Sequence, residues 1–200
     1  MAYNSSANFS LKGPRQQQSS EGFTLIEIII VLFFAGILVT VLFNLYDWHS
    51  KYYYYQQALV RVSSGSRQSV QTMQAYVSQA NLVLVSATVN GTTYTSSANT
   101  LVLQMPAINS SGSTISNKYD KVAFYPSGTN FYIQLEPDAA SSRKKLNKIL
   151  SDSLQSVTLT YDNASYALVT KVTVNFLSQL QVKAQTVQSN LVQNMYLLNY

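Results

Sequence analysis

The sequence Glu21-Gly22-Phe23-Thr24-Leu25-Ile26-Glu27 runs directly into Ile28–Tyr46, and together these segments set the organisation of the chain. Ile28–Tyr46 contains 19 consecutive uncharged residues, dominated by Ile, Val, Leu and Phe. As a helix it would be about 28 Å long, close to the roughly 30 Å hydrocarbon core of a bilayer. A core element of a soluble domain is the alternative, but such an element rarely has so long an uncharged stretch without a turn signal. The pattern therefore predicts one membrane-inserted helix.

The residues before this helix have a different composition. Residues 1–20 are polar and lack apolar periodicity, and their only charged side chains are Lys12 and Arg15. They read as a disordered leader. An ordinary secretory signal has its small-residue cleavage site after the apolar region. Here Gly22 precedes the apolar region, so removal of the leader would leave the helix on the mature protein.

The unbroken order Gly22, Phe23, Thr24, Leu25, Ile26 and Glu27, between a polar leader and an apolar helix, resembles the processing motif of type IV pilin-like proteins. The resemblance implies that prepilin peptidase cuts between Gly22 and Phe23, that Phe23 is N-methylated, and that Thr24, Leu25 and Ile26 complete the processing motif. It also implies a leader peptide at 1–22, a transmembrane and assembly helix at 23–46, and an extracytoplasmic head at 47–200. Leaders of this family usually carry basic residues beside the cut, whereas Glu21 lies there in this chain.

Glu27 is the one ionised side chain between Phe23 and Tyr46. A carboxylate inside a bilayer needs a partner, and no nearby lysine or arginine supplies one. The resemblance implies that Glu27 pairs with the Phe23 amine of an adjacent subunit during assembly. The alternative from the residues alone is an acidic side chain that complements the helix dipole and reaches the headgroups.

The rest of the chain predicts an α+β fold, with a long N-terminal helix packed on an antiparallel sheet. Apolar residues at spacings of three and four extend the helix to the low eighties: Leu59, Val62, Ser66, Val70, Met73, Val77, Ala80 and Leu84. Strands are predicted at 83–89, 92–95, 100–105, 122–125, 131–135, 156–161, 168–176 and 191–200. Hairpin turns are expected at Asn90-Gly91 and at 126–130, and Pro106 is expected to end its strand.

An aromatic cluster follows the apolar run, comprising Tyr46, Trp48 and Tyr52–Tyr55. A sugar-binding or base-stacking platform is one interpretation. Because consecutive helical residues point in different directions, they cannot form one flat platform, and we favour an interfacial belt that also packs against other subunits.

Composition leaves little material for catalysis. The chain has no cysteine, one histidine (His49) and only 10% charged residues, so thiolate chemistry and cysteine or histidine-rich metal sites are excluded. A serine triad would depend on His49 alone. Asp120, Asp138 and Asp162 lack the dense spacing of a calcium loop. We therefore expect no enzyme activity, no cofactor and no metal.

The only basic cluster consists of Arg143, Lys144, Lys145 and Lys148, in a chain of net charge +5. It is the place where a DNA-binding hypothesis would start. Phosphate binding usually needs a broader basic stripe, and such a run more often lies on a solvated loop or a short helix face.

The function that the resemblance implies is that of a structural, minor subunit of a type IV pilus or of a type II secretion-like pseudopilus. The segment Ser156–Phe176 broadly resembles the J-type minor pseudopilins. The implied partners are prepilin peptidase, other pilin or pseudopilin subunits, inner-membrane assembly machinery and membrane lipid. The implied topology is a single pass of the cytoplasmic membrane with a cytoplasmic N-terminus, and the mature form lies in a surface or periplasmic filament. The alternatives are a DNA-uptake or adhesive pilin and a membrane-anchored extracytoplasmic enzyme.

Overall fold

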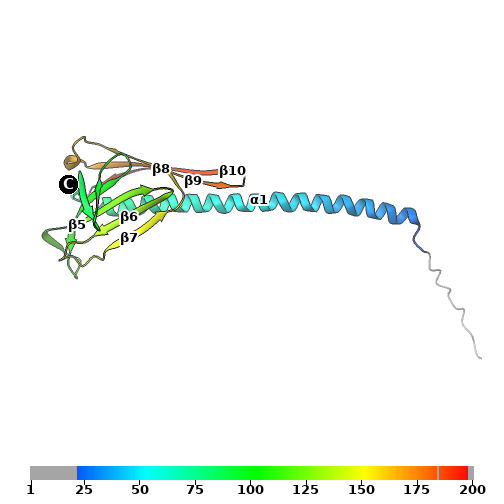
Figure 1. Cartoon of the computed structure of the whole chain (residues 1–200), viewed down its shortest axis with the longest axis horizontal. Coiled ribbons are helices and arrows are strands. Elements are labelled where there is room, and N and C mark those ends of the chain that lie inside the picture. Colours follow the sequence, from blue (N-terminus) through cyan, green and yellow to red (C-terminus); the bar gives the residue numbers. More distant parts are fainter. Residues whose placement is uncertain (1–21, 184, 198–200) are drawn as a thin grey trace, which may run out of the picture. The chain divides into compact units, whose positions relative to one another are not determined.

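The computed structural model describes residues 22–183 and 185–197 (Figure 1). The chain divides after Trp48 into two compact units, and α1 contributes to both. The elements are α1 (Leu25–Val77), β1 (Leu82–Val83), β2 (Ser86–Val89), β3 (Thr92–Thr95), β4 (Leu101–Ile108), β5 (Thr114–Ser127), β6 (Asn130–Glu136), β7 (Leu146–Ser151), β8 (Leu154–Tyr161), the 3-10 helix η1 (Tyr166–Leu168), β9 (Lys171–Val182) and β10 (Gln185–Tyr196). One long helix with antiparallel sheets confirms the predicted α+β class.

The strands of the second unit form three sheets. Five strands pair in the order β1-β4-β5-β6-β7, three pair in the order β10-β9-β8, and β2 pairs with β3. Every pairing is antiparallel. Most neighbours in the sheets are also neighbours in sequence, because short turns connect antiparallel strands directly.

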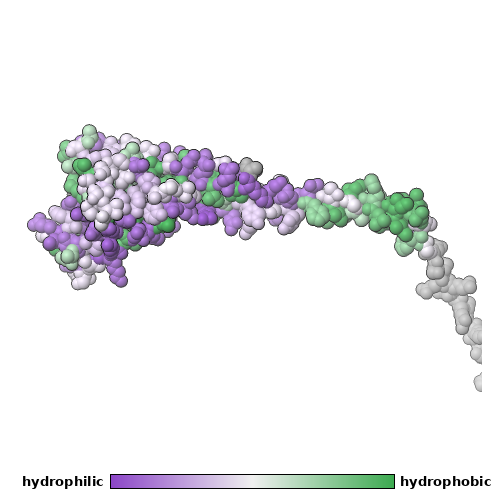
Figure 2. Space-filling view, in the orientation of Figure 1, coloured by the Kyte–Doolittle hydropathy of each residue, from purple (hydrophilic) through white to green (hydrophobic). Residues whose placement is uncertain are grey.

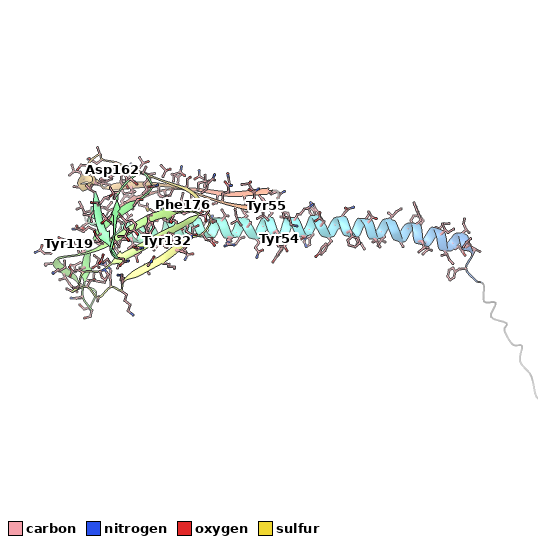
Figure 3. The ribbon with its side chains drawn as sticks, viewed as in Figure 1. Tyr54, Tyr55, Tyr119, Tyr132, Asp162 and Phe176 are labelled. Carbon is pink, nitrogen blue, oxygen red and sulfur yellow. The ribbon has the colours of Figure 1, made fainter. Side chains whose placement is uncertain are left out.

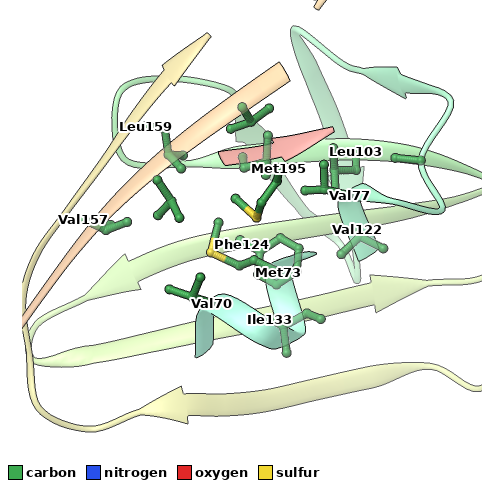
Figure 4. Packing of buried hydrophobic residues seen from close by; sticks show 14 of the residues in the cluster. Val70, Met73, Val77, Leu103, Val122, Phe124, Ile133, Val157, Leu159 and Met195 are labelled. Atoms are coloured by element: carbon green, nitrogen blue, oxygen red, sulfur yellow. The ribbon is translucent and has the colours of Figure 1, made fainter. Parts of the chain in front are cut away.

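The C-terminal half of α1 supplies one side of a single hydrophobic core (Figure 4). Val70, Met73 and Val77 lie in the same buried cluster as Phe124 of β5 and Phe176 of β9. The helix therefore joins the five-stranded and three-stranded sheets in one core. Complete burial of an apolar side chain of this size is worth about 1.5–3 kcal/mol, so this stripe is a main source of the stability of the second unit.

The predicted stripe also contains a polar member, Ser66, which is fully buried. Its Oγ lies 2.8 Å from the Val62 carbonyl oxygen of the preceding turn and 2.8 Å from the Ser178 Oγ of β9. Gly65 lies beside Ser151, where an added Cβ would come within 3.4 Å of the serine Oγ. Small side chains thus let α1 approach the strands closely here, and the hydroxyl has a partner as burial requires.

The helix ends earlier than the predicted low eighties. It stops at Val77. The following amides form hydrogen bonds to the residue three positions earlier, as in a 3-10 turn: Gln79 N–H donates to Tyr76 C=O and Ala80 N–H donates to Val77 C=O, both at 3.1 Å. Asn81 N–H then donates to Gln104 C=O of β4. The apolar periodicity continued past Val77 because Ala80 is still buried in the core, although it no longer belongs to the helix.

Several strand boundaries also differ from the prediction. The single strand expected at 83–89 is divided into β1 and β2. The strand expected to end at Pro106 continues to Ile108, with a register shift between Pro106 and Ile108. A bulge of this kind tolerates the missing proline N–H. The other predicted strands overlap observed ones, and several of these extend further than predicted. Strand β7 was not predicted, and positions 198–200 of the last predicted strand lie outside the described residues.

Both predicted hairpin turns are present. Asn90 and Gly91 have φ of 53° and 83°, the positive values that a two-residue turn between β2 and β3 requires. The turn between β5 and β6 is tighter than expected, because Ser127 pairs directly with Asn130 and Gly128 takes a φ of 59°.

Candidate functional site

The first unit presents an uncovered apolar helix surface. The large apolar side chains from Phe23 to Tyr46 are exposed, from 47% at Ile37 to 82% at Phe23. Figure 2 shows the hydrophobic residues gathered on this part of α1. The segment is long and apolar enough to cross a membrane, and none of its most apolar window is buried. Such a surface is stable only in lipid or against other apolar surfaces.

A small-residue notch lies within this surface. Gly36 and Thr40 are one helical turn apart, and nothing comes within 4 Å of a Cβ added at Gly36. The Thr40 hydroxyl donates to the Gly36 carbonyl oxygen at 2.9 Å, so it carries no unsatisfied donor into lipid. Small residues at this spacing let two apolar helices approach closely. This pair was not predicted, although the Gly36-x-x-x-Thr40 spacing is visible in the sequence.

Glu27 forms a capping box with Thr24 at the start of α1. The Thr24 N–H and hydroxyl both donate to Glu27 Oε2, at 2.8 and 2.9 Å, and the Glu27 N–H donates back to Thr24 Oγ1 at 3.3 Å. This reciprocal arrangement satisfies amides that have no partner within the helix. The carboxylate thus has a partner within its own chain, which is Thr24 and not a lysine or arginine. The Thr-x-x-Glu spacing was the available signal.

The capping box uses one carboxylate oxygen only. Within residues 22–183 and 185–197, no hydrogen bond reaches Glu27 Oε1. The first helical bond, Ile28 N–H to Thr24 C=O at 3.3 Å, places Thr24 at the helix boundary. Glu27 can therefore cap its own helix and still offer one oxygen to a donor from another molecule. The two roles weighed for Glu27 do not exclude each other in this geometry.

Gly22 and Phe23 precede the helix and have no regular secondary structure. Both are exposed, and nothing lies within 4 Å of a Cβ added at Gly22. The peptide bond between them is accessible, and the fold itself places no demand for glycine at position 22. Leader residues 1–21, including Lys12, Arg15 and Glu21, lie outside the described residues.

The aromatic cluster does not form a flat platform. The Tyr53 and Tyr54 rings meet edge to face, with centroids 6.0 Å apart and planes at 71°. Tyr54 and Tyr55 are both on α1 (Figure 3), where Lys183 of the β9–β10 turn lies 5.2 Å from the Tyr54 ring centre. Tyr55 is half-buried, whereas Tyr52 and Tyr53 are 52% and 60% exposed. These orientations agree with the helical argument against a stacking platform.

The basic cluster is divided by the fold. Arg143 donates through Nη1 to Asp120 Oδ2 at 2.7 Å and to the Pro106 carbonyl oxygen at 2.6 Å. The Asp120 side chain is completely buried, and it also accepts from Asp138 N–H at 2.8 Å and Ser141 Oγ at 2.9 Å. Arg143 is therefore part of the internal structure.

The three lysines of the cluster have a different environment. Lys144 and Lys145 are exposed before β7, and Lys148 is exposed on β7 itself. The expectation of a solvated loop or short helix was thus wrong for Lys148. A strand was missed there because its exposed residues conceal the apolar alternation.

The three aspartates considered for calcium lie in structural contacts. Asp120 is bound by Arg143, and the Lys118 ammonium is 3.9 Å from Asp138. Asp162 accepts from the Thr170 hydroxyl at 2.6 Å and from the Thr170 N–H at 3.1 Å, which closes the connection between β8 and β9. Among the described residues, no group of three or more His, Cys, Asp or Glu side chains could hold a metal ion.

No family model, curated protein or solved structure matches this chain.

Proposed function

We propose that this chain is a structural subunit of a membrane-assembled filament of the type IV pilus or pseudopilus kind. The observation that carries the proposal is the order of features at the start of the described chain: an accessible Gly22-Phe23 bond, Glu27 at the helix start, and a long uncovered apolar helix. A membrane anchor alone would need only the apolar helix. A leader that can be cleaved off in front of the helix, together with an acidic residue in the first turn of the helix, favours a subunit that leaves the membrane after processing.

The processing step proposed is cleavage by prepilin peptidase between Gly22 and Phe23, followed by N-methylation of Phe23. The exposed, non-helical Gly22-Phe23 segment is compatible with entry into a protease cleft. Cleavage creates a positively charged amine at Phe23, next to the Thr24 N–H that Glu27 Oε2 already accepts.

The assembly step uses the same carboxylate. In a filament, Glu27 Oε1 accepts a hydrogen bond from the Phe23 amine of a neighbouring subunit, while Oε2 keeps the helix cap. The charge pair fixes the axial register of one helix against the next, and the Gly36 notch lets the apolar helices pack closely.

In the proposed topology, the leader is cytoplasmic and residues 47–200 form an extracytoplasmic head. We place the chain among the minor subunits, since its segment Ser156–Phe176 broadly resembles the J-type minor pseudopilins. A structural role also fits a chain with one histidine and no cysteine. DNA binding by the basic cluster is less favoured, because Arg143, the one arginine of that cluster, is bound to buried Asp120.

The proposal is tested by intact-mass measurement of the chain from a strain with and without prepilin peptidase. We expect a mature species that begins at methylated Phe23 only when the peptidase is present. Gly22→Leu, which the open surroundings of Gly22 accommodate, should leave the precursor uncut in the membrane. A mature chain that keeps its leader, or that begins after the apolar helix, would refute the proposal.

A further inference from the structure

The turn between β9 and β10 brings a second lysine beside Lys51 of α1. The pair Val182 and Gln185 closes this turn, and Lys183 has a φ of 53°, as the first residue of a tight hairpin turn does. The turn lies against α1, because the Lys183 ammonium is 5.2 Å from the centre of the Tyr54 ring. Lys51 precedes Tyr54 by one helical turn on the same face of α1. The two lysines thus meet, although they are far apart in the sequence.

A cavity of about 230 Å³ lies between these groups. It is lined by Lys51, Val182, Lys183 and Gln185, and the two lysines and the glutamine are exposed, so the cavity is accessible from outside the protein. Lysine ammonium groups and a glutamine amide are hydrogen-bond donors, and lysine is a common ligand of phosphate. The cavity therefore offers donors and positive charge to an anionic group.

Few carboxylates oppose this positive charge. The acidic side chains after residue 50 all contact groups elsewhere in the head: Asp120, Glu136, Asp138, Asp152 and Asp162. Asp47 is the exception, since it precedes Lys51 by one turn of α1. Within residues 22–183 and 185–197, no salt bridge reaches Lys183. Lys183 therefore adds a positive charge that no carboxylate of the described chain neutralises.

The place of the cavity along α1 favours the membrane surface as the source of the anion. The uncharged run ends at Tyr46, and Lys51 follows about 8 Å later at the helical rise. The headgroup layer on each side of the hydrocarbon core is about 5–7 Å thick. Helical side chains tilt towards the N-terminus, and lysines near the end of a membrane helix extend to the headgroups. Lys51 thus meets a lipid phosphate first, and Lys183 covers it from the side of the head.

We propose that Lys51 and Lys183 bind the phosphate of an anionic membrane lipid while the chain is in the membrane. The inference rests on the membrane insertion in the proposed function, and it does not depend on cleavage or assembly. Each lysine near an anionic membrane surface contributes about fivefold in affinity. The contact ties the β9–β10 turn to the headgroups at the point where α1 leaves the bilayer.

Lipid binding by the full chain in micelles of a neutral detergent, measured by native mass spectrometry, tests the site. We expect phosphatidylglycerol to bind at least about fivefold more tightly than phosphatidylcholine. Lys183→Gln should raise the dissociation constant for phosphatidylglycerol about fivefold, whereas Lys183→Arg should keep it. The matched control is Lys148→Gln, which removes the same charge from exposed β7 and should leave the constant unchanged. Equal effects of Lys183→Gln and Lys148→Gln, or equal affinity for the two lipids, would overturn the proposal.

Asp47→Asn tests the same site with the opposite sign. It should lower the dissociation constant for phosphatidylglycerol, because it removes the one acidic side chain near Lys51 along α1. A constant equal to that of the unaltered chain, or higher, would contradict a phosphate beside Lys51.

Inorganic phosphate distinguishes a lipid site from a site for free phosphate. An excess of it should not displace phosphatidylglycerol, because the lipid shares the micelle with α1 and so has a high local concentration. Displacement would assign the cavity to free phosphate and overturn the lipid proposal. Flotation of the chain with phosphatidylglycerol vesicles reports membrane insertion separately. A chain that floats but has no preference for phosphatidylglycerol would overturn the lipid site alone, whereas a chain that does not float would contradict the proposed function as well.

Discussion

Replacing Arg143 by methionine should destabilise the second unit, because it leaves the buried Asp120 carboxylate without its counter-ion. Asp120 is 0% exposed, and the Arg143 side chain is 17% exposed. Removing one partner of a buried pair costs about 3–5 kcal/mol. We expect about 3 kcal/mol, the low end of that range. Asp120 keeps its bonds from Asp138 N–H and Ser141 Oγ, which moderates the loss.

For a unit of this size, about 3 kcal/mol corresponds to a decrease of about 6–12 °C in Tm. Thermal unfolding of the full chain in detergent, followed by the circular dichroism of the sheets, measures this decrease. Lys144→Met is the matched control: it removes an exposed neighbouring charge and should change the free energy of unfolding by less than about 0.5 kcal/mol.

A second comparison isolates the charge on Asp120. Adding Asp120→Asn to Arg143→Met should recover part of the lost stability, because the amide is neutral and its oxygen can still accept from Asp138 N–H. If Arg143→Met were as stable as Lys144→Met, the reasoning would be refuted, because the buried ion pair would not be a source of stability.

Three further predictions concern the helix start, a half-buried phenol and the independence of the head. Glu27→Gln should keep the helix cap through its amide oxygen but enter filaments poorly, because it has no charge to pair with the Phe23 amine. Thr24→Val should lose about 1 kcal/mol of helix capping and still assemble. Equal incorporation of both variants in isolated filaments would refute charge pairing. Burial raises the pKa of Tyr125 to about 12, above its usual value of 10, so stability should fall as pH rises from 10 towards 12, and Tyr125→Phe should weaken that fall in urea unfolding. A chain that begins at Gln56 should be soluble, with a mixed helix and sheet spectrum, since the buried stripe and all strands lie beyond it; aggregation or a random-coil spectrum would contradict this.

Local patterns were enough for the elements whose structure depends on near neighbours. The apolar run Ile28–Tyr46, the stripe from Val62 to Val77 and the Asn90-Gly91 turn follow from periodicity and backbone preference, which operate over a few residues. The Thr24–Glu27 capping box is equally local and could have been read from its spacing. The α+β class follows from these elements together.

Tertiary structure decided what depends on residues far apart in sequence. Arg143 binds Asp120 because the segment between β6 and β7 lies beside β5 in the folded chain. The charges near Arg143 in the sequence could not indicate this contact. Leu146–Ser151 became the edge strand β7 because β6 offered it backbone partners, although three consecutive residues in it, Asn147 to Ile149, are exposed. The open edge of β10 likewise depends on which strands lie beside it. A strand's sequence sets its two faces, but only the order of the sheet determines which of its edges remains unpaired.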